Sequence, residues 1–284
     1  MNYYNAHSVS PLIIAHNKDQ TREINGDEFN QQIQKVVKIL QSFNGKCVAY
    51  KLDNTPAWLV IDAATAVSNK VAVPIAHFFS EQQTQYVLAQ CGANVFMSDT
   101  LNPLFGDPTA SITLFECYTL YIYEIVVANP GSYFPETQKV TFTSGSTGQP
   151  KGVCLSAKSQ MQVAQSLCDK INIKKPVHLC LLPLAVLLEN IAGVYAPLKS
   201  GGTVHLMPLN ELGFVGTALK QPAQLIAAID KVKPNTLILV PELLACLVTF
   251  AEDGWQPPSS LQFIAVGGAL VSEMLLTKAR SLNL

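Results

Sequence analysis

Helix-like and strand-like segments alternate along almost the entire chain, and this alternation restricts the fold more than any other feature. Apolar residues recur at helical spacing over 27–43, and the short apolar run 47–52 that follows is typical of a strand. Further helices are expected over 56–68, 80–90, 156–171, 186–200, 222–232, 241–252 and 272–282, and further strands over 71–75, 94–98, 112–117, 121–127, 177–182, 203–207, 236–240 and 261–266. Because strands separated by crossover helices run largely parallel, we expect an α/β fold of layered, largely parallel sheets with helices on both faces.

Start and stop signals divide this pattern. Residues 80–83 (Ser-Glu-Gln-Gln) have the spacing of a capping box and predict the start of one helix. The Asn-Pro-Gly sequence at 129–131 is a strong break. We therefore expect an N-terminal α/β subdomain over 1–130 and a second α/β subdomain over 131–284, both parts of one large domain. Two independent domains are the alternative.

Charge and apolar runs exclude several classes of protein. The formal net charge is −1 over 284 residues, so a nucleic-acid partner is not expected. Residues 1–17 lack the pattern of a signal peptide, and the most apolar stretch, 179–188, is too short to span a bilayer. Charged residues make up only 14% of the chain, against about 25% in typical domains. We expect a cytoplasmic protein with no transmembrane segment. The low charge fraction also indicates that another protein segment covers some of its surface.

The cysteines and histidines do not predict a metal site. The seven cysteines are scattered and contain no C-x-x-C pair, which is typical of free thiols in a reducing cytosol. His178 and Cys180 are interpreted as residues on alternate faces of a strand rather than as a pair of ligands. No metal ligand is therefore assigned.

A segment rich in hydroxyl groups and glycine, 141–153 (Thr-Phe-Thr-Ser-Gly-Ser-Thr-Gly-Gln-Pro-Lys-Gly-Val), follows a short apolar run. Its hydroxyl donors are Thr143, Ser144, Ser146 and Thr147, and its first two glycines are Gly145 and Gly148. The glycines let backbone N–H groups approach a polyphosphate, and Lys151 can follow the β- and γ-phosphates. The segment is not a Walker A loop, because Pro150 stands where that loop needs glycine. A flexible turn before a helix is the alternative.

With Pro-Lys-Gly in place after the hydroxyl run, 141–153 closely resembles the phosphate loop of the adenylate-forming (AMP-binding) superfamily. That superfamily contains acyl- and aryl-CoA synthetases, luciferases and the adenylation domains of peptide synthetases. The resemblance implies the fold of the N-terminal subdomains of acyl-CoA synthetases, with ATP and Mg²⁺ as cofactors. It also implies that Lys151 and Thr147 act in catalysis. The residues implied to bind the nucleotide are Thr143, Ser144, Gly145, Ser146, Thr147, Gly148 and Lys151.

Two further segments resemble the superfamily's acid pocket. Residues 261–269 form an apolar strand that ends in a Gly-Gly-Ala turn, and ligands of open α/β sheets bind beyond such strand ends. Residues 182–190 are similar to the acid-pocket segment of long-chain acyl-CoA synthetases, with aliphatic side chains where many relatives have a histidine or an aromatic residue. This favours an alkyl substrate. The alternatives are a tight turn and a buried helix start without a ligand. The residues implied to bind substrate are Val186, Leu188, Gly267, Gly268 and Ala269.

The resemblance implies a ligase that forms an acyl-adenylate from ATP and a carboxylic acid, most similarly to fatty acid–CoA ligases. The acyl group would then pass to coenzyme A or to the phosphopantetheine of a carrier protein. The family's Mg²⁺-binding glutamate, its ribose-binding aspartate and its C-terminal domain have no counterpart here, and Lys278 does not match that domain's lysine. We therefore expect that the chain is the incomplete N-terminal part of such a ligase. Assembly into a homodimer is left open. The alternative is a non-catalytic module or regulatory subunit that binds a nucleotide or acyl ligand. A dehydrogenase is disfavoured, because no G-x-G-x-x-G follows an early strand.

Overall fold

The structure is a computed structural model, and it describes residues 4–5, 7–18, 20–126, 131–143 and 150–284. It separates into two compact units. The first is Gly26–Gln162, and the second combines the N-terminal segment up to Asn25 with Val163–Leu284. This division differs from the boundary expected near residue 130, because the strand that begins at Thr137 pairs with a strand of the first unit.

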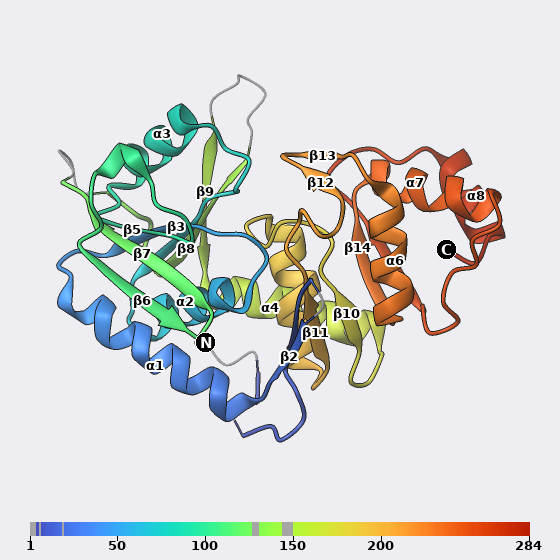
Figure 1. The fold of residues 1–284 in the computed structure, drawn as a ribbon, viewed down its shortest axis with the longest axis horizontal. Coiled ribbons are helices and arrows are strands. Elements are labelled where there is room, and N and C mark those ends of the chain that lie inside the picture. The colour runs from blue at the N-terminus through green and yellow to red at the C-terminus, as the bar shows by residue number, and fades with distance from the viewer. Residues whose placement is uncertain (1–3, 6, 19, 127–130, 144–149) are drawn as a thin grey trace. The chain divides into compact units, whose positions relative to one another are not determined.

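The first unit contains a seven-stranded sheet in the order β6-β7-β5-β3-β4-β8-β9 (Figure 1). Its strands are β3 (Cys47–Lys51), β4 (Val71–Pro74), β5 (Val95–Ser98), β6 (Ala110–Leu114), β7 (Tyr118–Glu124), β8 (Thr137–Thr143) and β9 (Lys151–Ser156). The four central strands β5, β3, β4 and β8 are parallel, whereas β6, β7 and β9 pair antiparallel. The helices are α1 (Gly26–Ser42), α2 (Pro56–Val67) and α3 (Glu81–Cys91), with a 3-10 turn η1 (Pro103–Phe105).

Burial explains the sequences of these helices. The buried apolar residues of α1 recur at helical spacing, as expected for a helix with one face on a sheet, and they are Phe29, Ile33, Val36, Val37 and Leu40. In contrast, α2 is buried from Pro56 to Thr65, so its sequence is apolar almost throughout and carries one charged residue, Asp62. The predicted capping box of α3 is confirmed: Ser80 Oγ accepts from the Gln83 N–H, and the Gln83 side chain accepts from the Ser80 N–H.

The second unit contains a six-stranded sheet in the order β15-β14-β10-β11-β1-β2 (Figure 1). Its strands are β1 (Ile13–Asn17), β2 (Gln20–Ile24), β10 (Val177–Leu179), β11 (Thr203–Leu206), β14 (Thr236–Leu239) and β15 (Phe263–Val266). All neighbours are parallel except the edge strand β2. The other elements are η2 (Glu189–Tyr195), α5 (Ala196–Lys199), α6 (Pro222–Val232), α7 (Pro241–Glu252), α8 (Glu273–Ser281) and the hairpin β12 (Phe214–Val215) and β13 (Ala218–Leu219); the division between the units falls within α4 (Ala157–Ile171). The core joins apolar residues of β10, β14, α6 and α7.

The expected α/β fold is confirmed, but several segments differ from the sequence prediction. Strands β1 and β2 were not predicted, and neither were β8 and β9, which flank the predicted phosphate loop. The helix expected over 186–200 is a π-helix, η2, followed by the short α5. Within the described parts of the chain, no helix combines the length and apolar character needed to cross a bilayer.

Candidate functional site

The predicted phosphate loop lies at the end of a β-hairpin. Strands β8 and β9 pair antiparallel, and their last register pair is Thr143 with Lys151, both exposed. The prediction of a loop over 141–153 is therefore wrong at both ends, where the backbone is extended and paired. The predicted residues Ser144, Gly145, Ser146, Thr147 and Gly148 lie outside the described residues. The two described candidates for binding phosphate thus lie opposite each other across the hairpin.

A buried ion pair fixes β8 within the first unit. The Lys139 ammonium lies 2.7 Å from Asp62 Oδ1, and the two side chains are 0% and 1% exposed. The Tyr50 hydroxyl also donates to Asp62 Oδ1, at 2.8 Å. Burial lowers the pKa of Lys139, and Asp62 opposes that shift. Because Lys139 is also the residue that pairs with Ala72 of β4, the strand that leads into the loop is held through both its backbone and a side chain.

A pocket of about 340 Å³ lies beside this hairpin, within the first unit. Its walls come from the hairpin, from α3 and from the segment around Tyr133. Aromatic rings, two thiols and a lysine are among its lining residues, which include Tyr86, Cys91, Tyr133, Phe142, Lys151 and Cys154. The pocket therefore provides a partly apolar volume next to one of the predicted binding residues.

The two predicted acid-binding segments meet in the second unit. A Cβ on Gly267 would lie 3.0 Å from Leu188 Cδ2, so the glycine leaves space that the leucine side chain fills. Gly268 has a φ of +87°, a backbone conformation that favours glycine. Val186 is half-buried, and Ala269 is exposed at the same turn as the two glycines. The structure thus brings Leu188 and Gly267 together, as their assignment to one pocket requires.

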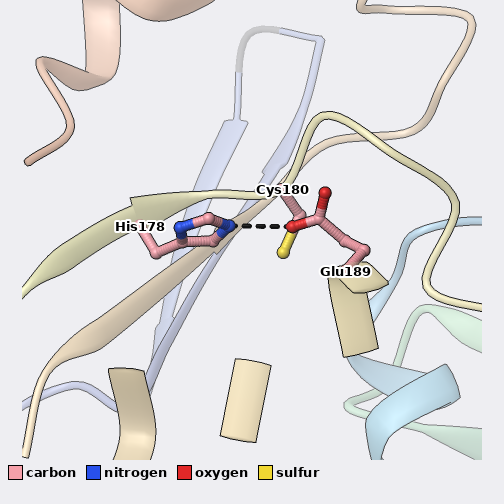
Figure 2. Close-up of side chains that lie close together, drawn as sticks. All are labelled: His178, Cys180 and Glu189. Atoms are coloured by element: carbon pink, nitrogen blue, oxygen red, sulfur yellow. Dashed lines mark hydrogen bonds and ion pairs between the residues drawn. The ribbon is translucent and has the colours of Figure 1, made fainter. Parts of the chain in front are cut away.

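A fully buried polar group adjoins the acid segment (Figure 2). His178 Nε2 lies 2.8 Å from Glu189 Oε1, and both side chains are 0% exposed. Cys180 lies against the same carboxyl group, and one nitrogen, one sulfur and one oxygen of the three residues lie within 4.8 Å of one another. The interpretation that His178 and Cys180 lie on alternate faces is therefore wrong. Residues two positions apart along an extended chain share a face.

These side chains have the ligand types of a zinc site, but hydrogen bonds within the protein already engage them. His178 Nδ1 lies 2.9 Å from Thr236 Oγ1, and Glu189 Oε2 accepts from the Leu182 N–H at 2.9 Å. Burial, together with the neighbouring Glu189, raises the pKa of Cys180 well above its ordinary value, so this thiol stays protonated. The group is a closed hydrogen-bond network that joins β10, β14 and the start of η2.

Sequence reasoning missed both buried networks. Asp62 gave a usable signal, because a lone charged residue in an apolar helix requires a partner. No pattern identifies that partner as Lys139. His178 and Glu189 gave no signal, because their contact depends on how a strand and a helix pack together.

Fold and loop sequence together define the class of protein: the structure has the fold of the N-terminal part of adenylate-forming enzymes. Among solved structures, the chain is similar to o-succinylbenzoate CoA synthetase from Bacillus subtilis bound to a product analogue. The TM-score is 0.73 at 18% identity, and the match covers 96% of this chain and 54% of that one.

The chain belongs to the AMP-binding enzyme family, whose model matches residues 6–283. It is 21% identical over 273 residues to the human long-chain-fatty-acid–CoA ligase ACSBG2. That match covers 84% of this chain and 39% of the ligase. It is 28% identical over 141 residues to 4-coumarate–CoA ligase-like 8 of Arabidopsis thaliana. That match covers 49% of this chain and 24% of that relative. The chain thus spans less than half the length of either relative.

Proposed function

We propose that the complete protein containing this chain activates a carboxylic acid with ATP and Mg²⁺. A carboxylate oxygen attacks the α-phosphorus of ATP, the bond to the bridging oxygen breaks, and pyrophosphate leaves. The product is an acyl-adenylate. A thiol then attacks the acyl carbonyl, and AMP leaves as the thioester forms. Membership of the AMP-binding family is the observation that carries this proposal.

The hairpin between β8 and β9 would bind the pyrophosphate end of ATP. Thr143 and Lys151 are register partners and both are exposed, so a hydroxyl donor and an ammonium group are available at the two ends of one loop. Lys151 would neutralise charge on the leaving pyrophosphate, with Thr147 as a further catalytic donor. The other loop donors would be Ser144 and Ser146, with backbone N–H groups near Gly145 and Gly148. Preorganised donors of this kind are usually the largest source of rate enhancement in such chemistry.

The acid is proposed to be a fatty acid. Leu188 packs on Gly267, so the proposed acyl end of the site is lined by aliphatic groups and backbone. Val186 and Leu188 are half-buried and lack polar side-chain atoms that an amino-acid substrate would need. The similarity to a long-chain-fatty-acid–CoA ligase supports the same substrate class. Coenzyme A is the proposed acceptor thiol, and a carrier-bound phosphopantetheine is the alternative acceptor.

Product analysis tests this function. The complete protein would be incubated with MgATP, coenzyme A and one acid at a time from three classes: saturated fatty acids, cinnamic acids and amino acids. We expect acyl-CoA and AMP in equal amounts with fatty acids, detected by mass spectrometry. Products with cinnamic or amino acids alone would contradict the substrate class, and nucleotide binding without any product would favour the non-catalytic module.

A further inference from the structure

The segment 182–188 is tied at both of its ends to one buried carboxyl group. Glu189 directly follows the segment, and its Oε2 accepts a hydrogen bond from the N–H of Leu182, the first residue of the segment, at 2.9 Å. Its Oε1 contacts His178 Nε2 at 2.8 Å (Figure 2). A single side chain thus closes the segment into a loop and attaches that loop to strand β10.

The histidine that holds this carboxyl group is itself fixed. His178 pairs with Thr236 in the register between β10 and β14, and its Nδ1 lies 2.9 Å from the Thr236 hydroxyl. His178 and Glu189 are 0% exposed, so water does not compete for these hydrogen bonds. The loop is therefore fixed to two central strands of the sheet.

The helix that follows the segment is shaped around the same pair. A Cβ at Gly193 would collide with Glu189 Oε1 and would lie 2.6 Å from His178 Nε2, so only glycine lets the helix backbone approach this closely. The segment Glu189–Tyr195 is a π-helix, a form that is rare and is frequently found at functional sites. Its first residue is Glu189 itself.

We infer that Glu189 and His178 are positioning residues for the acid pocket, because they hold segment 182–188 in the conformation that seats Leu188 on Gly267. Neither the Glu189 nor the His178 side chain is proposed to touch the substrate. They act through Leu188, which sets the shape of the acyl end of the pocket. This inference rests on the proposed function and deepens it, because it identifies what defines the acid site.

Three variants of the complete protein test the inference through kinetics. Glu189→Ala removes the carboxyl group that contacts His178 Nε2 and the Leu182 N–H, and Gly193→Ala pushes that carboxyl group aside while keeping every polar group. Glu189→Gln keeps both contacts. Its amide oxygen accepts from the Leu182 N–H, and its amide nitrogen donates to His178 Nε2 when the imidazole proton lies on Nδ1, which then donates to Thr236 Oγ1. The matched control is Glu242→Gln at the exposed start of α7.

We expect Gly193→Ala and Glu189→Ala to raise KM for the fatty acid by about tenfold or more and to leave KM for ATP within about twofold. Glu189→Gln and Glu242→Gln should retain wild-type values for both substrates. The inference is overturned if the two KM values rise together, or if Gly193→Ala behaves as the wild type. A partial loss of folding would lower the apparent kcat and leave both KM values unchanged, whereas a positioning role raises KM for the acid alone.

A second measurement does not require activity. Hydrogen exchange of the Leu182 amide would be followed by NMR in the wild type, Glu189→Gln and Gly193→Ala. We expect strong protection in the first two and faster exchange, by about tenfold or more, in Gly193→Ala. Equal protection in all three would show that Glu189 and His178 do not clamp segment 182–188, even if the enzyme activates fatty acids. If the wild type activates no acid but the exchange result holds, the proposed function fails and the clamp stands.

Discussion

The side chain of Leu188 lies against Gly267, with its Cδ2 atom 3.0 Å from the position that a Cβ on the glycine would occupy. These two residues are far apart in the sequence. Each was assigned to the acid pocket because its own segment resembles a part of that pocket. Their contact gives the proposed acyl site a wall made of one aliphatic side chain and one bare stretch of backbone. The identity of both residues should therefore govern which acids fit.

Substitutions at this contact should change acid selectivity in opposite ways. Gly267→Ala adds a methyl group where Leu188 already lies, so kcat/KM for fatty acids should fall by roughly tenfold. Leu188→Ala opens the same space and should shift the preference towards bulkier acids. The double variant should recover part of the loss, and a double-mutant cycle would measure this coupling. Strictly additive effects would show that the two residues do not shape one pocket.

Lys151 should be required for ATP rather than for the acid. Lys151→Ala removes the exposed ammonium that lies opposite Thr143, so KM for ATP should rise by roughly tenfold while KM for the acid stays unchanged. Lys158→Ala, an exposed lysine at the start of α4, is the matched control. Unchanged ATP kinetics in Lys151→Ala would remove this residue from the phosphate site.

Breaking the ion pair that fixes β8 should destabilise the first unit. Lys139→Met removes the cation beside the buried Asp62 carboxyl group, and breaking a buried ion pair in this way typically costs about 3–5 kcal/mol. Lys158→Met on the surface should change stability by less than about 0.5 kcal/mol. Urea unfolding of the 284-residue chain, followed by circular dichroism, measures both. A Lys139→Met variant as stable as the wild type would contradict the described packing of β8.

Two stacked histidines should make the chain sensitive to acid. His16 Nε2 and His205 Nδ1 lie 2.9 Å apart, and burial is the main cause that lowers the pKa of each to about 4 from 6.5. Lys231 adds to the shift of His16, and both His16 and His178 add to that of His205. The unfolded chain therefore binds more protons between these two values, so stability is full above pH 6.5 and falls as the pH drops towards 4.

Histidine NMR titration and urea unfolding measured at several pH values check this expectation. Two imidazole resonances should stay in the neutral form well below pH 6.5, and the urea midpoint should fall over the same range. Removing the pair with His16→Gln and His205→Gln together should flatten the pH dependence. Titration of both rings near pH 6.5 would contradict the burial of this pair.

Local patterns predicted most helices, because a helix that buries one face or all faces has apolar residues at the corresponding spacing in the sequence. The apolar spacing of α1 and the capping residue Ser80 of α3 are examples. Strands β8 and β9 were missed because 141–153 was interpreted as one loop, and their extended conformation comes from pairing with each other and, for β8, with β4. Such pairing joins residues that no local window contains.

Candidate site residues could be proposed from the sequence where one short segment contains them, and not where distant elements meet. Thr143 and Lys151 come from one short segment of the sequence and are register partners at the ends of β8 and β9. The clamp on the acid segment instead needs a strand residue, His178, to face a helix residue, Glu189, across a glycine. The π-helix η2 begins at this contact, whereas the sequence alone indicated an ordinary helix.

ATP–pyrophosphate exchange tests whether the complete protein forms an acyl-adenylate. Labelled pyrophosphate would be incubated with MgATP and the protein, with and without a saturated fatty acid and without any thiol. We expect label in ATP only when the fatty acid is present, and we expect Lys151→Ala to lose that exchange at limiting ATP. Exchange that never depends on an acid, or no exchange with any acid, would contradict the proposed function.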